Sequence, residues 1–272
     1  MKLESLTDSG PQILPLRAFR DNYIWLLRRG QSAVVVDPGE AAPVLAYLTA
    51  ENLQLAAILV THHHEDHVGG LDEILAQLRY DSPLPVYGPQ MENIAGVNQP
   101  LGDGDRVELP SLQASLEVLA VPGHTRGHIA YYGRKLCGCG ALFCGDTLFA
   151  CGCGRLFEGT PAQMWRSLQR LAALPAATRV YCAHEYTEAN IRFAQAVEPD
   201  NAALHERAQE VARLRAAALP SVPSVLAEEL ATNPFLRCAA PAVREAAQQY
   251  SGQIQADALA VFTAIRDWKN KF

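Results

Sequence analysis

The sequence crowds histidine and carboxylate side chains into a stretch of six residues that begins at His62. His62 and His64 are two positions apart, so in an extended segment both imidazoles point to one side while His63 faces away. Asp66 and His67 follow where the chain turns into a predicted helix, and they diverge enough to reach a second metal ion. Donors of this kind, without cysteine, suit zinc, iron or manganese. A lone histidine is most often structural, but a cluster this dense favours a metal site.

Three other segments place a metal-binding residue directly after a predicted strand. These residues are His124, Asp146 and His184. Asp146 is preceded by Gly145, which permits a close approach of the backbone. Each segment is weak support when taken alone, but several strand-end donors in one chain reinforce one another.

Together, these residues resemble the metal-ligand set of the metallo-β-lactamase superfamily. Longer motifs narrow the resemblance to the glyoxalase II, or hydroxyacylglutathione hydrolase, family. The motifs are Gly-Asp-Thr-Leu-Phe from Gly145, Gly-Cys-Gly-Arg from Gly152, His-Glu-Tyr-Thr from His184 and Asn-Pro-Phe from Asn233. The resemblance spans nearly the whole chain and includes its C-terminal segment.

The resemblance implies an α/β fold, a four-layer α/β/β/α sandwich with a C-terminal helical domain. It also implies two divalent metal ions, zinc first, with iron or manganese as alternatives. One ion would take His62, His64 and His124; the other would take Asp66, His67 and His184. Asp146 would bridge the two ions, and Asp66 and Asp146 would be the catalytic carboxylates. By the same resemblance His128 supports the site without binding metal, whereas His63 and His205 are structural or exposed.

The resemblance further implies that a glutathione thioester binds Arg155, Phe157, Tyr186, Arg266 and Lys269. Arg266 and Lys269 are three positions apart and therefore share one face of a helix. Phe157 stands where family members commonly carry tyrosine, so a stacking surface is kept but a hydroxyl donor is lost.

The implied activity is hydrolysis of S-(2-hydroxyacyl)glutathione, chiefly S-D-lactoylglutathione, by a binuclear metal-bound hydroxide, the second step of methylglyoxal detoxification. A water molecule that bridges two cations loses a proton near neutral pH, and a thiolate leaves readily. The alternatives are a single-iron sulfur dioxygenase, a β-lactamase, a nuclease of the same fold, or an inactive metal-binding scaffold.

The elements that must position these residues are mainly strands in the first part of the chain. Strands are predicted over 23–27, 32–36, 55–61, 85–87, 117–121, 129–132, 141–143 and 179–182, with one helix over 71–78. Thr160 and Pro161 predict the start of a helix that runs to Leu174. Helices are then predicted over 201–219, 224–231, 242–250 and 257–272. The expected domains are residues 1–185, which bind metal, and residues 186–272, which bind substrate.

Composition narrows the choice of partners. The 272 residues carry a formal charge of −6 and give a pI near 5.8, which disfavours nucleic acid as a partner. No apolar run suits a membrane helix or a signal peptide, and the seven cysteines are poor material for a disulfide framework. We therefore expect a cytoplasmic monomer without a membrane partner. The pairs Cys137/Cys139 and Cys151/Cys153 raise the idea of an extra metal site, but their spacing favours free thiols.

Overall fold

Strand β2 (Asn22–Arg29) has apolar side chains on both of its faces, so it must lie in an inner layer of the molecule. Trp25 and Leu27 belong to the core between two β-sheets, whereas Ile24 and Leu26 belong to a second core on the opposite face. Side chains of a strand alternate between its faces, so an apolar run of this kind must be covered on both sides. The structure, a computed structural model, describes residues 10–78 and 82–272.

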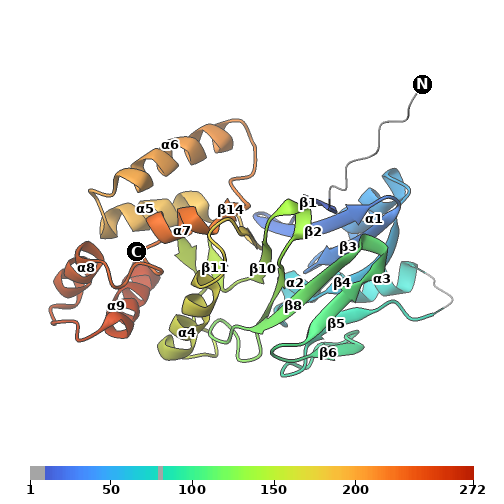
Figure 1. Ribbon diagram of the computed structural model, residues 1–272, viewed down its shortest axis with the longest axis horizontal. Coiled ribbons are helices and arrows are strands. Elements are labelled where there is room, and N and C mark those ends of the chain that lie inside the picture. The colour runs from blue at the N-terminus through green and yellow to red at the C-terminus, as the bar shows by residue number, and fades with distance from the viewer. Residues whose placement is uncertain (1–9, 79–81) are drawn as a thin grey trace.

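Two six-stranded sheets form the middle of the fold (Figure 1). The first has the order β1 (Gln12–Ala18), β2, β3 (Ser32–Val36), β4 (Gln54–Leu59), β5 (Val86–Pro89) and β6 (Gln99–Leu101). The second has the order β14 (Ser224–Val225), β13 (Arg179–Cys182), β10 (Ala141–Gly145), β9 (Ile129–Gly133), β8 (Ala114–Ala120) and β7 (Arg106–Leu109). A separate small hairpin joins β11 (Leu148–Phe149) to β12 (Gly152–Cys153).

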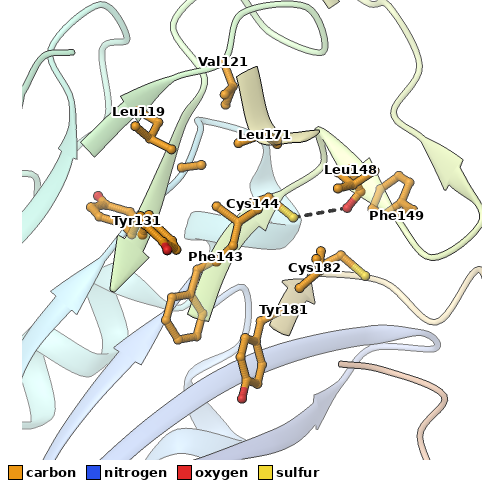
Figure 2. Packing of buried hydrophobic residues seen from close by; sticks show 14 of the residues in the cluster. Leu119, Val121, Tyr131, Phe143, Cys144, Leu148, Phe149, Leu171, Tyr181 and Cys182 are labelled. Carbon is orange, nitrogen blue, oxygen red and sulfur yellow. Dashed lines mark hydrogen bonds between the residues drawn. The ribbon is translucent and has the colours of Figure 1, made fainter. Parts of the chain in front are cut away.

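Helices cover the outer faces of the two sheets. Val44 of α1 (Ala41–Ala50) and Ile74 of α3 (Leu71–Gln77) belong to the core on the outer face of the first sheet. Leu168 of α4 (Pro161–Ala172) belongs to the core that contains the second sheet. Part of this core is seen in Figure 2, where the rings of Phe143 and Tyr181 stack with their centroids 5.0 Å apart. The predicted four-layer α/β/β/α sandwich is therefore confirmed.

Five helices follow the sandwich and gather on one side of it (Figure 1). They are α5 (Thr187–Val197), α6 (Ala202–Ala216), α7 (Leu226–Thr232), α8 (Pro241–Ser251) and α9 (Ala258–Lys271). The prediction that residues 224–225 begin a helix is wrong. These two residues form β14, which pairs with Arg179 and Val180 of β13, because the edge of the second sheet offers them backbone partners. The helical segment thus also contributes an edge strand to the sandwich.

Local sequence signals set several helix ends. Thr160 and Gln163 form the capping box of α4, since each side chain bonds to the other residue's backbone N–H. Gly252 has a φ of 68° and terminates α8, as a glycine can do without strain. No helix among residues 10–78 and 82–272 is long and apolar enough to cross a lipid bilayer.

Candidate metal centre and substrate cavity

The candidate site lies where strands of both sheets end. His62 and His64 follow β4 of the first sheet, and Asp66 and His67 lie on the short helix α2 (Glu65–Val68). The donors after the second sheet's strands follow β8, β10 and β13; they are His124, Asp146 and His184. The structure brings all seven predicted donors into three overlapping groups, in each of which the donor atoms lie within 4.8 Å of one another.

The first group is formed by three imidazoles. His64 Nδ1 lies 3.1 Å from His62 Nε2 and 3.0 Å from His124 Nε2. The second group places His184 Nε2 3.4 Å and His67 Nε2 3.6 Å from Asp66 Oδ2.

Asp146 belongs to the remaining group, with His62 and His67, and lies between the other two groups. Its Oδ2 is 3.4 Å from His124 Nε2, whereas its Oδ1 is 3.4 Å from both His67 Nε2 and His184 Nε2. One oxygen of this carboxylate therefore faces each group.

The donor set fits bound cations. Among the described residues, His67 Nε2 and Asp146 Oδ1 are buried without a hydrogen-bond partner, which is costly unless another group satisfies them. Donors about 2.1 Å from one tetrahedral ion lie about 3.4 Å from each other, and several pairs at this site have that separation. A site of this fold with these histidine and aspartate groups binds divalent metal ions.

Outer acceptors orient the rings. His67 Nδ1 lies 3.1 Å from Asp37 Oδ2, His184 Nδ1 lies 3.0 Å from Asp21 Oδ1, and His124 Nδ1 lies 2.9 Å from the Arg155 carbonyl oxygen. An Nδ1–H that donates outward leaves the Nε2 lone pair free to face the centre. Sequence reasoning missed Asp21 and Asp37 as site residues; the only signal was their position in a turn or at a strand end.

Asp37 also fixes the strand end that carries the first donors. It accepts hydrogen bonds from the Thr61 backbone N–H at 2.7 Å and from Thr61 Oγ1 at 2.8 Å. Thr61 Oγ1 then lies 3.0 Å from His62 Nδ1 and accepts from it, since its own hydrogen is donated to Asp37. Asn22 was missed as well, and its Nδ2 donates to Asp66 Oδ2 at 3.0 Å.

The histidines of the two groups have pKa values shifted in opposite directions. Burial lowers the pKa of His62 well below its usual value and also lowers the pKa of His124. Burial opposes charge at His67 too, but the carboxylates of Asp146 and Asp37 outweigh it and raise the pKa of His67 to about 10. For His184, burial is likewise outweighed by Asp146 and by hydrogen bonds to carboxylates, which raise its pKa to about 11.

The other histidines have separate surroundings. His63 lies outside both groups, with Nδ1 3.0 Å from Glu92 and Nε2 3.3 Å from Glu158. His128 is buried and accepts from the Asp146 backbone N–H at 3.2 Å, while its ring stacks on that of His62. Gly145 precedes Asp146 with a φ of 46°, and a Cβ there would collide with the side chains of Thr61 and His128. The backbone on the N-terminal side of Asp146 is therefore tightly constrained.

A cavity of about 440 Å³ opens beside the donors. His124 and Asp146 contribute to its wall. So do the five residues predicted to bind substrate, namely Arg155, Phe157, Tyr186, Arg266 and Lys269. These seven residues come from distant parts of the chain. The fold therefore places the candidate metal centre at the wall of a cavity that is also lined by cationic and aromatic side chains.

Aromatic rings link the cavity to the metal donors. The ring of Tyr186 stacks on His184 with centroids 4.6 Å apart and an interplanar angle of 5°. Phe157 is 63% exposed, and its ring meets the edges of His64 and His124 at centroid distances of 5.5 and 5.2 Å. Phe157 therefore gives a substrate an apolar surface next to the first donor group.

The two cations of α9 that line the cavity, Arg266 and Lys269, already make hydrogen bonds within the protein. Arg266 donates from Nη1 to the Cys153 carbonyl oxygen at 2.9 Å, and its buried Nε has no hydrogen-bond partner within the described part of the chain. Lys269 Nζ donates to the Ala189 carbonyl oxygen at 3.0 Å. Burial, together with Arg266 and Arg192, lowers the pKa of Lys269 to about 8.

The cysteines take no part in the donor groups found among the described residues. Cys151 and Cys153 are free and buried, and Cys153 lines the cavity. Burial raises the pKa of both thiols, as expected of unreactive cysteines. The side chain of Cys137 lies outside the described part of the structure.

Comparison with known proteins agrees with this geometry. Residues 17–184 match the model of the metallo-beta-lactamase superfamily, the class that the sandwich and its donor set define. The crystal structure of ETHE1 from Myxococcus xanthus aligns with a TM-score of 0.62 at 23% identity, covering 95% of this chain and 90% of that one. That of the BLEG-1 B3 metallo-beta-lactamase aligns with a TM-score of 0.60 at 22% identity, covering 83% and 99%. At such low identity these likenesses support the fold alone.

Residues 185–272 match the model described as hydroxyacylglutathione hydrolase C-terminus. The hydroxyacylglutathione hydrolase of Alkalilimnicola ehrlichii is 56% identical over 262 residues, which cover 96% of this chain and 99% of that protein. The hydroxyacylglutathione hydrolase of Nitrosomonas europaea is 52% identical over 260 residues, covering 96% of both. The chain belongs to the hydroxyacylglutathione hydrolase family.

Proposed function

We propose that this protein hydrolyses S-(2-hydroxyacyl)glutathione, chiefly S-D-lactoylglutathione, to glutathione and a 2-hydroxy acid, as the second step of methylglyoxal detoxification. The observation that carries the proposal is one cavity that combines His124 and Asp146 of the metal centre with Arg155, Arg266 and Lys269. The near full-length similarity to named hydroxyacylglutathione hydrolases supports it.

The metal centre is proposed to hold two ions, with zinc as the first candidate. His62, His64 and His124 would hold one ion, and Asp66, His67 and His184 would hold the other, with Asp146 between them. When bound, such ions lower the pKa of a water molecule toward neutrality and polarise a carbonyl group. Asp66 and Asp146 are the carboxylates closest to that chemistry; Asp66 lies against two of the imidazoles that face the centre, and Asp146 lies against three.

The cavity residues would bind and orient the substrate. Glutathione carries carboxylates, for which Arg155, Arg266 and Lys269 offer positive partners. Tyr186 and Phe157 flank the donor groups on two sides and would confine the acyl end between aromatic surfaces. Because the leaving thiol ionises near pH 8.5, about as a free cysteine does, the chain needs no strong general acid.

We propose that two regions of the chain have separate roles in the reaction. Residues 1–185 would supply the metal centre, and residues 186–272 would supply most of the glutathione contacts. The position of Arg266 and Lys269 on α9 supports this division, although β14 of the second region also extends the sheet of the first. We also propose that the protein acts as a monomer, because the donor groups and the cavity wall can be built within a single chain and need no residue of a second copy.

The test is hydrolysis of S-D-lactoylglutathione by the purified, metal-loaded protein, measured together with its metal content. We expect about two ions per chain, and loss of turnover when a chelator removes them. A fully loaded protein that leaves this thioester intact would overturn the proposal.

A further inference from the structure

The tip of the β11–β12 hairpin is held by side chains from the C-terminal helical segment. Asn233 Nδ2 donates to the Phe149 carbonyl oxygen at 3.1 Å and to the Gly152 carbonyl oxygen at 2.9 Å. Glu229 Oε2 accepts from the Cys151 backbone N–H at 2.9 Å. A neighbouring contact comes from α5, where Asn190 Nδ2 donates to the Ala150 carbonyl oxygen at 3.0 Å. Backbone groups of all four residues from 149 to 152 are thus bonded from outside the hairpin.

The β11–β12 hairpin is too short to be stable in this conformation by itself. Each of its strands is only two residues long, and isolated short hairpins are marginal in water. Cys151 has a φ of 54°, a left-handed conformation that residues other than glycine adopt only when their surroundings impose it. Its side chain packs with Ile191 and Leu204 of α5 and α6.

A buried ion pair fixes the residue that holds Cys151. Glu229 is fully buried, and its Oε1 accepts from Arg207 Nη2 at 2.5 Å. Arg207 is buried as well and donates from Nη1 to Thr232 Oγ1 at 2.6 Å. Asn233 Nδ2 lies 3.1 Å from Glu229 Oε2. The backbone of Cys151, the amide of Asn233 and the guanidinium of Arg207 therefore converge on one carboxylate.

The hairpin carries two residues of the cavity wall, Phe149 and Cys153. Phe149 lines the cavity and meets the rings of His184 and Tyr186 at 5.8 and 5.3 Å. The Cys153 carbonyl oxygen is the acceptor for Arg266. At the base of the hairpin, Cys144 Sγ lies 3.2 Å from the Leu148 carbonyl oxygen (Figure 2). A shift of the hairpin would therefore displace cavity groups while the strand beneath it stays in place.

We propose that Glu229 and Asn233 are positioning residues for substrate recognition. By fixing the backbone of residues 149–152 from outside, they set Phe149 and the Cys153–Arg266 contact relative to the metal centre. The inference rests on the proposed function, because it assigns these residues to the recognition of that substrate.

The first variant is Glu229→Gln, which keeps the size of the side chain but replaces one of its two acceptor oxygens by an amide N–H2, so that either Arg207 or the Cys151 backbone N–H loses its acceptor. We expect KM for S-D-lactoylglutathione to rise about tenfold while kcat falls less than about threefold, because substrate contacts are displaced more than metal ligands. Amide hydrogen exchange of residues 148–153 should be faster, and metal content should be unchanged. The matched control is Glu198→Gln, which breaks the Arg237–Glu198 pair, a second buried carboxylate of the helical segment that makes no hydrogen bond to the hairpin. Glu198→Gln should change neither KM for S-D-lactoylglutathione nor the hydrogen exchange of residues 148–153.

A second variant covers the case in which Glu229→Gln does not fold. The double change Arg207→Met with Glu229→Leu replaces the buried pair by apolar groups, which is often neutral for stability. It still removes the acceptor of the Cys151 N–H, so KM and hairpin exchange should rise as before. Unchanged exchange, unchanged KM despite faster exchange, or an equal effect in the Glu198→Gln control would each overturn the inference. Absence of thioesterase activity in the wild type would instead overturn the proposed function, and the exchange measurement would still test the hold on the hairpin.

Discussion

Asp146 is the residue on which the candidate centre depends most. Its two oxygens lie 3.4 Å from histidines of different groups, and its backbone N–H is held by His128. The sequence predicted which side chains meet at this centre, because histidine and aspartate residues follow the strand ends or, for Asp66 and His67, lie on the short helix α2 that comes after one. It did not predict Asp21 or Asp37, since an aspartate that supports a histidine has no spacing of its own and is recognised only once the fold brings the two together.

Replacing Asp146, the proposed bridging residue, should weaken metal binding at both groups. We expect Asp146→Ala to lose at least one metal ion per chain and to lower turnover by more than about a hundredfold, since even outer partners of metal ligands cost tenfold to a hundredfold. Metal analysis and steady-state kinetics check this. Asp103→Ala is the control, because Asp103 pairs with Arg170 on the surface. Full metal content with near-normal turnover in Asp146→Ala would exclude a bridging role.

The raised pKa values of His67 and His184 predict that metal binding releases protons. Their pKa values of about 10 and 11 mean that both rings are protonated in the metal-free protein at pH 7. An imidazole binds a cation only through a free lone pair, so about two protons should leave per chain on loading, and metal affinity should fall as pH falls. Calorimetric titrations in two buffers of different ionisation enthalpy measure this number. Binding without proton release would contradict the protonation assigned to these two histidines.

Lys269 predicts a pH dependence of substrate binding. With a pKa of about 8, its charge is present below that pH and is lost above it. KM for the glutathione thioester should therefore be flat below about pH 7 and should rise by up to about tenfold through pH 9. The Lys269→Arg variant, which stays charged, corrects for titration of the substrate itself. Identical pH profiles of KM in the two proteins would rule out Lys269 as a carboxylate ligand.

Several elements with strong local signals were predicted, but the helices α1 and α5 and the strands β1 and β7 were missed, as were the short strands that depend on tertiary pairing. The strands over Ser32–Val36 and Arg179–Cys182 have the predicted bounds, and α4 begins at its predicted cap. The two-residue strands β11, β12 and β14 were missed because two residues carry no periodicity. Strand β6 contains Pro100, which argues against a strand unless it lies at a sheet edge, as it does here.

The cap of α4 gives a prediction of stability. Thr160→Ala removes the side chain that accepts from the Gln163 N–H, so the free energy of unfolding should fall by about 1 kcal/mol. Urea unfolding of the metal-loaded protein measures the change. Thr49→Ala is the control, since the side chain of this exposed threonine donates to the Leu45 carbonyl oxygen within α1, and the variant should stay within about 0.5 kcal/mol of wild type. Equal stability of the two variants would mean that the capping box contributes nothing.

On the level of the whole molecule, an acidic chain encloses a cationic cavity. The formal charge of −6 repels an anionic substrate at long range, but Arg155, Arg266 and Lys269 reverse the field where it binds. Net charge alone therefore said little about the substrate, and the family resemblance was needed to connect the C-terminal cations with the strand-end donors. The fold makes that connection by packing α4 of the sandwich against α9 of the helical segment.

We propose above all that the metal centre and the residues that bind glutathione share one cavity. The most direct test of this claim compares two substrates of the metal-loaded protein. One is S-D-lactoylglutathione, and the other is the lactate thioester of a small uncharged thiol. Two lost charge-assisted contacts should lower kcat/KM for the second substrate by about a hundredfold. Lys269→Ala should weaken only the first reaction, mainly through KM. Equal kcat/KM for both substrates in the wild type would contradict this coupling and would leave a metallohydrolase of the same fold with another substrate.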